Sequence, residues 1–173
     1  ILAMVDEIIR QRVDKGAEET LPENSPTYSH QSNGVIERAV QSVEGMIRSL
    51  RSALEERING KLTITDSVWP WLVEYASFLL IRLEVGHDGK TAYERGKGKQ
   101  GRVSGIEFGE AVLWKRRPTG GALGKLAVMW EDGIYLGTKG TTGELIIGAG
   151  EGIYRTRSVQ RKPLEDRWRE DLI

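Results

Sequence analysis

The fold is decided by residues 30–58, which read HQSNGVIERAVQSVEGMIRSLRSALEERI. Near its start lies Asn33-Gly34, a pair that favours tight turns. Beyond this pair the apolar residues recur at steps of three and four, the spacing of one buried stripe on a helix: Ile36, Val40, Val43, Ile47, Leu50 and Leu54. We therefore predict a turn that leads into an amphipathic helix over residues 34–58, which Asn59-Gly60 ends.

The polar face of this predicted helix carries Glu37, Gln41, Glu44, Arg48 and Arg51. Glu37 falls in the first turn, where a carboxylate complements the helix dipole and needs no further role. Carboxylate oxygens are also the ligands that hard cations such as Mg²⁺ prefer. The residues alone leave both interpretations of Glu37 open.

Further helical segments flank the main helix. Residues 1–12 predict a helix end, and an acidic connector follows over residues 14–26. A second helix is predicted from an N-cap at Asp66 or Ser67 to Leu83. Its expected buried side consists of Trp69, Leu72, Val73, Ala76, Leu79, Leu80 and Leu83. A linker rich in Gly and Lys is predicted over residues 87–107, with a short helical turn at 91–95.

From Phe108 onward the hydrophobic period changes to two. Alternating runs separated by Gly-rich turns predict five strands, at 111–115, 125–130, 134–139, 144–147 and 153–157. Such short strands suggest a small barrel, because closing the sheet removes its exposed edges. The chain is therefore predicted to belong to the α+β class, with helices first and a small β-barrel after them.

Composition excludes several kinds of protein and site. Of the 173 residues, 39% are hydrophobic and 29% are charged, as in ordinary globular proteins. The absence of cysteine excludes disulfides and thiolate zinc sites within these residues. The longest apolar runs are too short to cross a bilayer, so no membrane partner is expected.

The formal net charge of zero hides a basic C-terminal half. Between residues 111 and 163, nine Lys and Arg residues stand against four Asp and Glu residues, a net charge of +5. An excess of this sign favours a polyanionic partner such as nucleic acid. The basic residues gather at Lys115-Arg116-Arg117 and again at Arg155, Arg157, Arg161 and Lys162, where sequence-independent contact with phosphates is predicted.

Residues 25–40, SPTYSHQSNGVIERAV, closely resemble the end of the catalytic core in retroviral and long-terminal-repeat retrotransposon integrases. The resemblance implies an RNase H-like core whose active site uses two aspartates and one glutamate to bind two divalent metals. Glu37 matches that glutamate and is the candidate catalytic and metal-binding residue. The cofactor implied for the intact enzyme is Mg²⁺ or Mn²⁺.

Later segments are similar to the same family. Residues 89–95, GKTAYER, look like the segment that follows the integrase core. Three further segments look like its small SH3-like DNA-binding domain: FGEAVLW (108–114), WEDG (130–133) and RSVQRKP (157–163). The resemblance therefore implies a C-terminal remnant of a truncated RNase H-like α/β core at 1–86, a linker at 87–107, an SH3-like barrel at 108–163 and a charged tail at 164–173.

The chain departs from the family pattern upstream of Glu37. Only Asp6 and Asp14 precede it, and both fall in predicted helix or connector rather than on strands. The second family aspartate is therefore expected before Ile1, and we interpret the sequence as a fragment of a longer protein. One carboxylate of three cannot hold a metal pair. We expect this fragment to bind no metal stably and to be inactive alone.

The leading hypothesis is a fragment of an integrase that binds nucleic acid during DNA integration. The residues expected to contact nucleic acid are Gln31, Asn33, Arg38, Gln41, Arg48, Lys115, Arg116, Arg117, Arg155 and Arg157. The expected partners are DNA and the remainder of the integrase within its Pol polyprotein, and a homo-oligomer stays open. The location that the resemblance implies is intracellular, and nuclear at the time of integration.

Two alternatives stay open. One is a non-catalytic DNA- or chromatin-binding module derived from a retroelement, which would bind DNA without help from Glu37. The other treats the barrel as a protein-interaction domain that assembles integrase multimers. In that case the tail from Glu165 to Ile173, with Trp168, is the expected contact.

Overall fold

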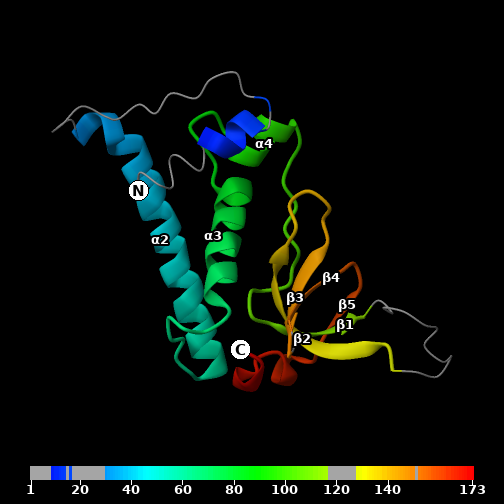
Figure 1. The fold of residues 1–173 in the computed structure, drawn as a ribbon. Coiled ribbons are helices and arrows are strands. Elements are labelled where there is room, and N and C mark those ends of the chain that lie inside the picture. Colours follow the sequence, from blue (N-terminus) through cyan, green and yellow to red (C-terminus); the bar gives the residue numbers. More distant parts are fainter. Residues whose placement is uncertain (1–8, 15, 17–29, 117–127, 151) are drawn as a thin grey trace. The chain divides into compact units, whose positions relative to one another are not determined.

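The computed structural model describes residues 9–14, 16, 30–116, 128–150 and 152–173 of the chain. The chain divides into two compact units, residues 1–40 and residues 41–173, and each is described by itself. In the first unit, residues 9–14 are helical and the first part of α2 begins at His30. The second unit holds the rest of α2, the other labelled helices and the sheet (Figure 1). Most of the predicted connector at 14–26 lies outside the described residues.

The main helix, α2, runs from His30 to Ile58. Its end agrees with the prediction, but the predicted turn at Gln31–Gly34 was wrong, because these residues are helical. Asn and Gly each cost a helix only about 0.5–1 kcal/mol. Extending an existing helix gains a hydrogen bond for each residue that is added, so a long helix can include them. Glu37 therefore lies about two turns into the helix rather than in its first turn.

The apolar stripe of α2 is buried only over its second half. Leu54 and Ile58 are buried in the core, and Ile47 and Leu50 pack partly buried against it. Ile36, by contrast, is 66% exposed, and Val40 is 51% exposed. The predicted stripe is thus confirmed from Ile47 onward, where other elements of the second unit supply apolar partners.

The second helix, α3, runs from Trp69 to Leu83, so the predicted cap at Asp66 or Ser67 was wrong. Val68 occupies the cap position and makes no side-chain capping bond. The Asp66 carboxylate instead accepts hydrogen bonds from the N–H and the hydroxyl of Thr63, each at 2.7 Å. The Asp66 carboxylate therefore stabilises a tight turn before the helix and does not cap the helix. Aspartate side chains commonly bond to nearby backbone groups in turns instead of helix ends.

The buried side of α3 is only partly the predicted one: Leu72 and Ala76 are buried as predicted, and Tyr75 and Phe78, which were not predicted, are buried with them. The Tyr75 ring lies 5.5 Å from that of Phe108 and, edge-on, 6.0 Å from that of Tyr135 in β2 (Trp130–Thr138). Val73 and Leu83, which were predicted to be buried, are exposed. Because α3 is apolar on nearly every side, its periodicity could not indicate which side the sheet would cover.

The short helix α4, Ala92–Lys97, confirms the predicted helical turn and starts with a capping box. The Glu94 N–H donates to Thr91 Oγ1 at 3.1 Å, and the Thr91 N–H donates to the Glu94 carboxylate at 2.7 Å. The bond from the Thr91 backbone lowers the pKa of Glu94. Two of the backbone donors that a helix start leaves open are thereby satisfied.

One antiparallel sheet holds the five strands, in the order β4-β3-β2-β1-β5. The other strands are β1 (Ala111–Lys115), β3 (Leu145–Ala149), β4 (Gly152–Thr156) and β5 (Val159–Arg161). The prediction of β1 is confirmed. The turn predicted between residues 130 and 134 was wrong, because β2 continues through it. A Cβ at Gly133 would lie 2.5 Å from Ile147 Cγ2, so this glycine serves the close approach of β3 rather than a turn.

The sheet curls until its two edge strands approach each other. β4 and β5 occupy opposite edges, yet only Arg157 and Ser158 separate them along the chain. Five flat strands would put the edges about 19 Å apart, whereas three residue steps span at most about 11 Å. Curvature is therefore required. The hydrogen-bonded ladder stays open, since no β4–β5 pairing occurs among the described residues.

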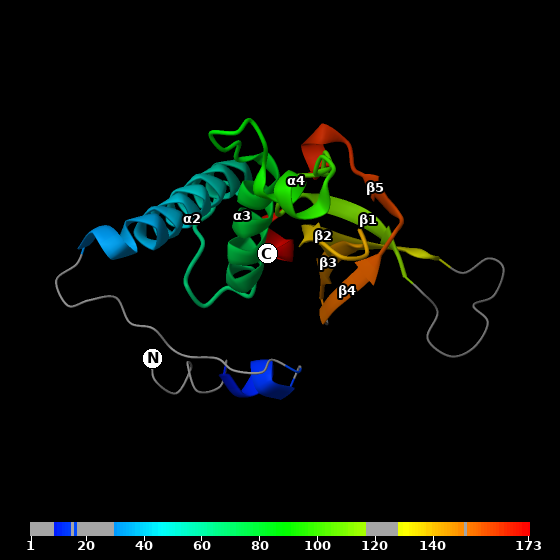
Figure 2. The ribbon, with the colours of Figure 1, turned by 90° about the horizontal axis from the view of Figure 1, so that it is seen from above.

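Helices and sheet of the second unit share one hydrophobic core. Figures 1 and 2 show α3 between the sheet and the second part of α2. The core includes residues of α2, α3 and the strands, among them Leu54, Leu72, Tyr75, Trp114, Tyr135 and Ile147. After β5 come two 3₁₀ turns, η1 (Leu164–Asp166) and η2 (Glu170–Leu172), and Trp168 between them packs against this core. The α+β class is confirmed.

None of the helices in the described part of the chain is long and apolar enough to span a membrane.

Candidate nucleic-acid interface

Four of the predicted DNA-contacting residues come together where the end of β1 meets the end of β4: Lys115, Arg116, Arg155 and Arg157. Thr156 Oγ1 donates a hydrogen bond to the Lys115 carbonyl at 3.2 Å. The Lys115 N–H donates to the Ser158 carbonyl at 3.1 Å. The backbones that carry the four cations are thus held side by side, and we name these four residues the β1–β4 corner.

The corner is exposed and its ion pairs are weak. Arg116 Nη1 lies 3.3 Å from Glu131 Oε1, and Arg157 Nε lies 3.7 Å from Glu144 Oε1. The Arg157 side chain is 72% exposed. Solvated pairs of this kind contribute at most about 1 kcal/mol to stability. A phosphate that approaches the corner can therefore replace these carboxylates at little cost.

An aromatic pair, of which Trp114 is buried and Tyr154 half-buried, supports the corner from inside. The ring of Tyr154 in β4 stacks on the buried ring of Trp114 in β1, with centroids 4.6 Å apart and planes inclined by 25°. The Arg116 guanidinium lies 5.9 Å from the Tyr154 ring, at the range of a cation–π contact. Because Trp114 belongs to the core and the half-buried Tyr154 packs against it, the base of the corner is fixed by packing.

Two further cations, in and just after β5, are already neutralised within the fold. The Arg161 guanidinium forms two hydrogen bonds to the fully buried Glu110 carboxylate, at 2.6 and 2.8 Å, and these bonds raise the pKa of Arg161. Lys162 Nζ lies 2.5 Å from Asp132 Oδ1. These cations stabilise the closing segment of the sheet and contribute little to an interface. Arg117 lies outside the described residues.

The residues of α2 that were predicted to contact nucleic acid are spread along the helix and do not form one cluster with the corner residues. Glu37, Arg38 and Gln41 are exposed, and Asn33 is half-buried. Arg48 Nη1 lies 3.7 Å from Glu44 Oε2 one turn earlier, in a solvated pair. Gln31 is helical, and its side chain lies outside what the structure describes.

The described residues around Glu37 do not by themselves form a two-metal site. Such a site needs carboxylates from separate elements that converge on both ions. Within the described residues, no group of three or more His, Cys, Asp and Glu side chains could hold a metal ion. Glu37 itself is exposed on α2.

A second group of cations, which was not predicted from the sequence, lines a groove between the helices and the β2–β3 hairpin. Its central residue is Arg82 of α3, and Lys99, Arg102 and Lys139 lie around it. Two of its members, Lys99 and Arg102, could have been found from the sequence. Together with Lys97 they form a cluster of cations within six residues of the predicted linker. Arg82 gave no signal, since it is a lone cation in an apolar helix.

No protein-family model matches this chain, and no curated protein matches it either. Function is therefore inferred from the residues and their geometry.

Proposed function

We propose that this chain is the C-terminal part of a retroelement integrase and that it binds DNA through the β1–β4 corner. The observation that carries the proposal is the corner itself, where residues that the sequence spreads over 115–157 lie beside each other. Four exposed cations on a rigid base suit contact with successive phosphates. Such contact is independent of base sequence, and its affinity falls as salt rises.

The assignment to integrases draws on the motif in residues 25–40, whose Glu37 and Arg38 lie in α2. In this proposal the helices belong to the end of an RNase H-like core, and the sheet is an SH3-like barrel. The strand order supports the second part, because the last strand pairs beside the first and the sheet has to curl.

In the intact integrase, the resemblance groups Glu37 with two aspartates that hold Mg²⁺ or Mn²⁺. We propose that this chain alone binds DNA and performs no strand transfer. Its partners in the proposal are DNA and the remainder of the Pol polyprotein, with nuclear location at integration.

The test is DNA affinity as a function of salt. The triple variant Arg116→Gln, Arg155→Gln and Arg157→Gln keeps the backbone and Lys115 but removes three charges. The slope of log affinity against log salt should become shallower by about three, roughly one for each lost phosphate contact. Fluorescence anisotropy with a duplex oligonucleotide measures both quantities. Arg169→Gln is the matched control, because Arg169 pairs with Asp171 and Asp132 and is not one of the corner residues. Unchanged slope and affinity in the triple variant would refute the DNA-binding corner.

Glu37→Gln separates catalysis from binding in the same assay. DNA affinity should be unchanged, and neither wild type nor variant should join strands with Mg²⁺ or Mn²⁺. Strand transfer by the wild-type chain that Glu37→Gln abolishes would contradict the proposed inactivity. A coding sequence upstream of Ile1 that specifies a strand ending in Asp would favour the integrase over the non-catalytic DNA- or chromatin-binding module.

A further inference from the structure

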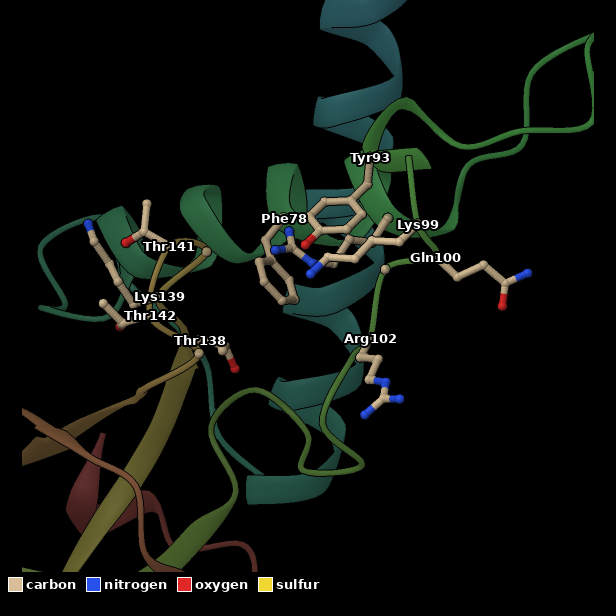
Figure 3. A pocket seen from close by; sticks show the side chains of 13 residues that line it. Phe78, Tyr93, Lys99, Gln100, Arg102, Thr138, Lys139, Thr141 and Thr142 are labelled. Atoms are coloured by element: carbon tan, nitrogen blue, oxygen red, sulfur yellow. The ribbon is translucent and has the colours of Figure 1, made fainter. Parts of the chain in front are cut away.

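A second recess in residues 41–173 carries positive charge that the β1–β4 corner does not use. It lies between α3, α4, the loop at 99–102 and the tip of the β2–β3 hairpin, and its volume is about 730 Å³. We name it the Arg82 groove. Figure 3 shows Tyr93 and Lys99 beside Phe78, with Thr141, Thr142 and Lys139 across from them on the hairpin.

Arg82 is held in this groove by aromatic rings rather than by a carboxylate. Its guanidinium lies 3.8 Å from the centroid of the Phe78 ring and 4.5 Å from that of Tyr93. A Cβ at Gly101 would lie 2.8 Å from Arg82 Cγ, so the loop backbone packs closely on the stem. The side chain is thereby fixed before any ligand arrives, which lowers the entropy that binding must remove.

The hydrogen-bonding capacity of Arg82 is unused within the described part of the chain. No described carboxylate lies within 4.0 Å of its guanidinium, and no described group accepts a hydrogen bond from it. The same holds, among described residues, for ion pairs of Lys99, Arg102 and Lys139. Half-buried guanidinium N–H groups suit a phosphate, which can accept two at once.

None of the described residues that line the groove is acidic. The nearest acid along the hairpin, Glu144, is engaged by Thr142 Oγ1 at 3.1 Å and by Arg157 at 3.7 Å. The corner residues Arg116 and Arg157, in contrast, each have a carboxylate partner. Among the described residues, none of the four groove cations has a carboxylate partner, whereas two of the four corner cations have one. A recess lined by charges of one sign concentrates their field.

We propose that the Arg82 groove binds the phosphates of a single-stranded stretch of nucleic acid. The volume is that of a pocket for one small molecule. One or two nucleotides of a strand can enter such a recess, whereas a duplex would meet only its rim. A cationic groove with aromatic residues is the usual means of binding single strands without sequence preference. The inference rests on the proposed function for its class of partner, but on different residues.

The experiment uses the full chain and a short fluorescein-labelled oligothymidylate, followed by anisotropy at fixed low salt. Arg82→Met keeps the apolar stem and removes the charge, and it should weaken binding about tenfold. Lys139→Gln should weaken it less, in the same direction. The matched control is Arg95→Gln on α4, since Arg95 is bound by Asp88 outside the groove lining. Circular dichroism melting checks that each variant is folded.

If Arg82→Met does not fold, the double variant Lys99→Gln and Lys139→Gln takes its place, with the same tenfold expectation. Unchanged oligothymidylate affinity in a folded groove variant overturns the proposal. If pyrophosphate displaces the oligothymidylate at equal concentration, the proposal that the ligand is nucleic acid is overturned. The groove would then be a site for a free phosphate compound. Equally strong competition by a duplex of the same length overturns the preference for single strands.

The triple corner variant distinguishes this inference from the proposed function. It should lose duplex binding and retain most of its oligothymidylate binding. If the triple corner variant binds both duplex DNA and oligothymidylate as the wild type does, the proposed DNA-binding role of the corner is refuted. The proposal for the Arg82 groove would still stand.

Discussion

A single buried charge, Glu110, illustrates what decides the role of a cation in this molecule. Arg161 and Arg157 are four residues apart, and in the sequence both look like candidates for phosphate contact. Arg161 meets the fully buried Glu110 through two hydrogen bonds, while Arg157 has one solvated pair at 3.7 Å. The partner of Arg161 lies 51 residues away. Local sequence therefore cannot tell a structural arginine from one that is available for a ligand.

Glu110→Gln should lower the free energy of unfolding by about 2–3 kcal/mol, because it leaves the Arg161 guanidinium without its charged acceptor. The substitution preserves side-chain volume, so the loss reports on charge and hydrogen bonding rather than packing. Urea denaturation measures it. Glu165→Gln, at an exposed position in η1, should change stability by less than about 0.5 kcal/mol. Equal effects of the two substitutions would show that the buried pair contributes no more than a surface charge.

At the scale of elements, the sequence predicted what local patterns determine. The end of α2 at Asn59-Gly60, the capped turn of α4 and the bounds of β1 all follow from short-range chemistry. The interior of β2 was predicted as a Gly-rich turn, and its Asp132-Gly133 pair is indeed common in tight turns. Pairing with β1 and β3 overrides that preference, and β5 has only three residues, too few for a visible alternation.

Gly133→Ala tests whether close strand approach, and not a turn, requires this glycine. The added Cβ would lie 2.5 Å from Ile147 Cγ2 and 2.9 Å from the Gly148 carbonyl oxygen, so we expect a loss of about 1–3 kcal/mol. Thermal unfolding followed by circular dichroism measures the difference. Gly105→Ala is the control, since nothing lies within 4 Å of a Cβ there. A variant at 133 as stable as the control would mean that β3 can withdraw from β2 without cost.

At the scale of the whole molecule, both candidate sites are products of long-range packing. The composition of the corner was predictable, because its cations are clustered in sequence, but their meeting depends on the curl of the sheet. The Arg82 groove was not predictable, since its lining residues come from α3, α4, a loop and a hairpin. The first and last of them, Phe78 and Gly143, are 65 residues apart. The motif around Glu37 indicated a family and did not indicate where ligands bind. The motif, which suggests a family, and the geometry, which locates the candidate sites, are therefore independent, and each site needs its own test.

Tyr75 joins the helices to the sheet, and its removal tests whether residues 41–173 unfold as one unit. Its ring contacts those of Phe78, Phe108 and Tyr135, so Tyr75→Ala should cost about 3–5 kcal/mol. If the shared core couples both layers, amide hydrogen exchange should accelerate by the same free energy in α3 and in β2. Val73→Ala, on the exposed side of α3, should change neither. Faster exchange confined to α3 would mean that the sheet holds its fold without the helices. The Arg82 groove is lined by both layers, so it would then open independently of the β1–β4 corner.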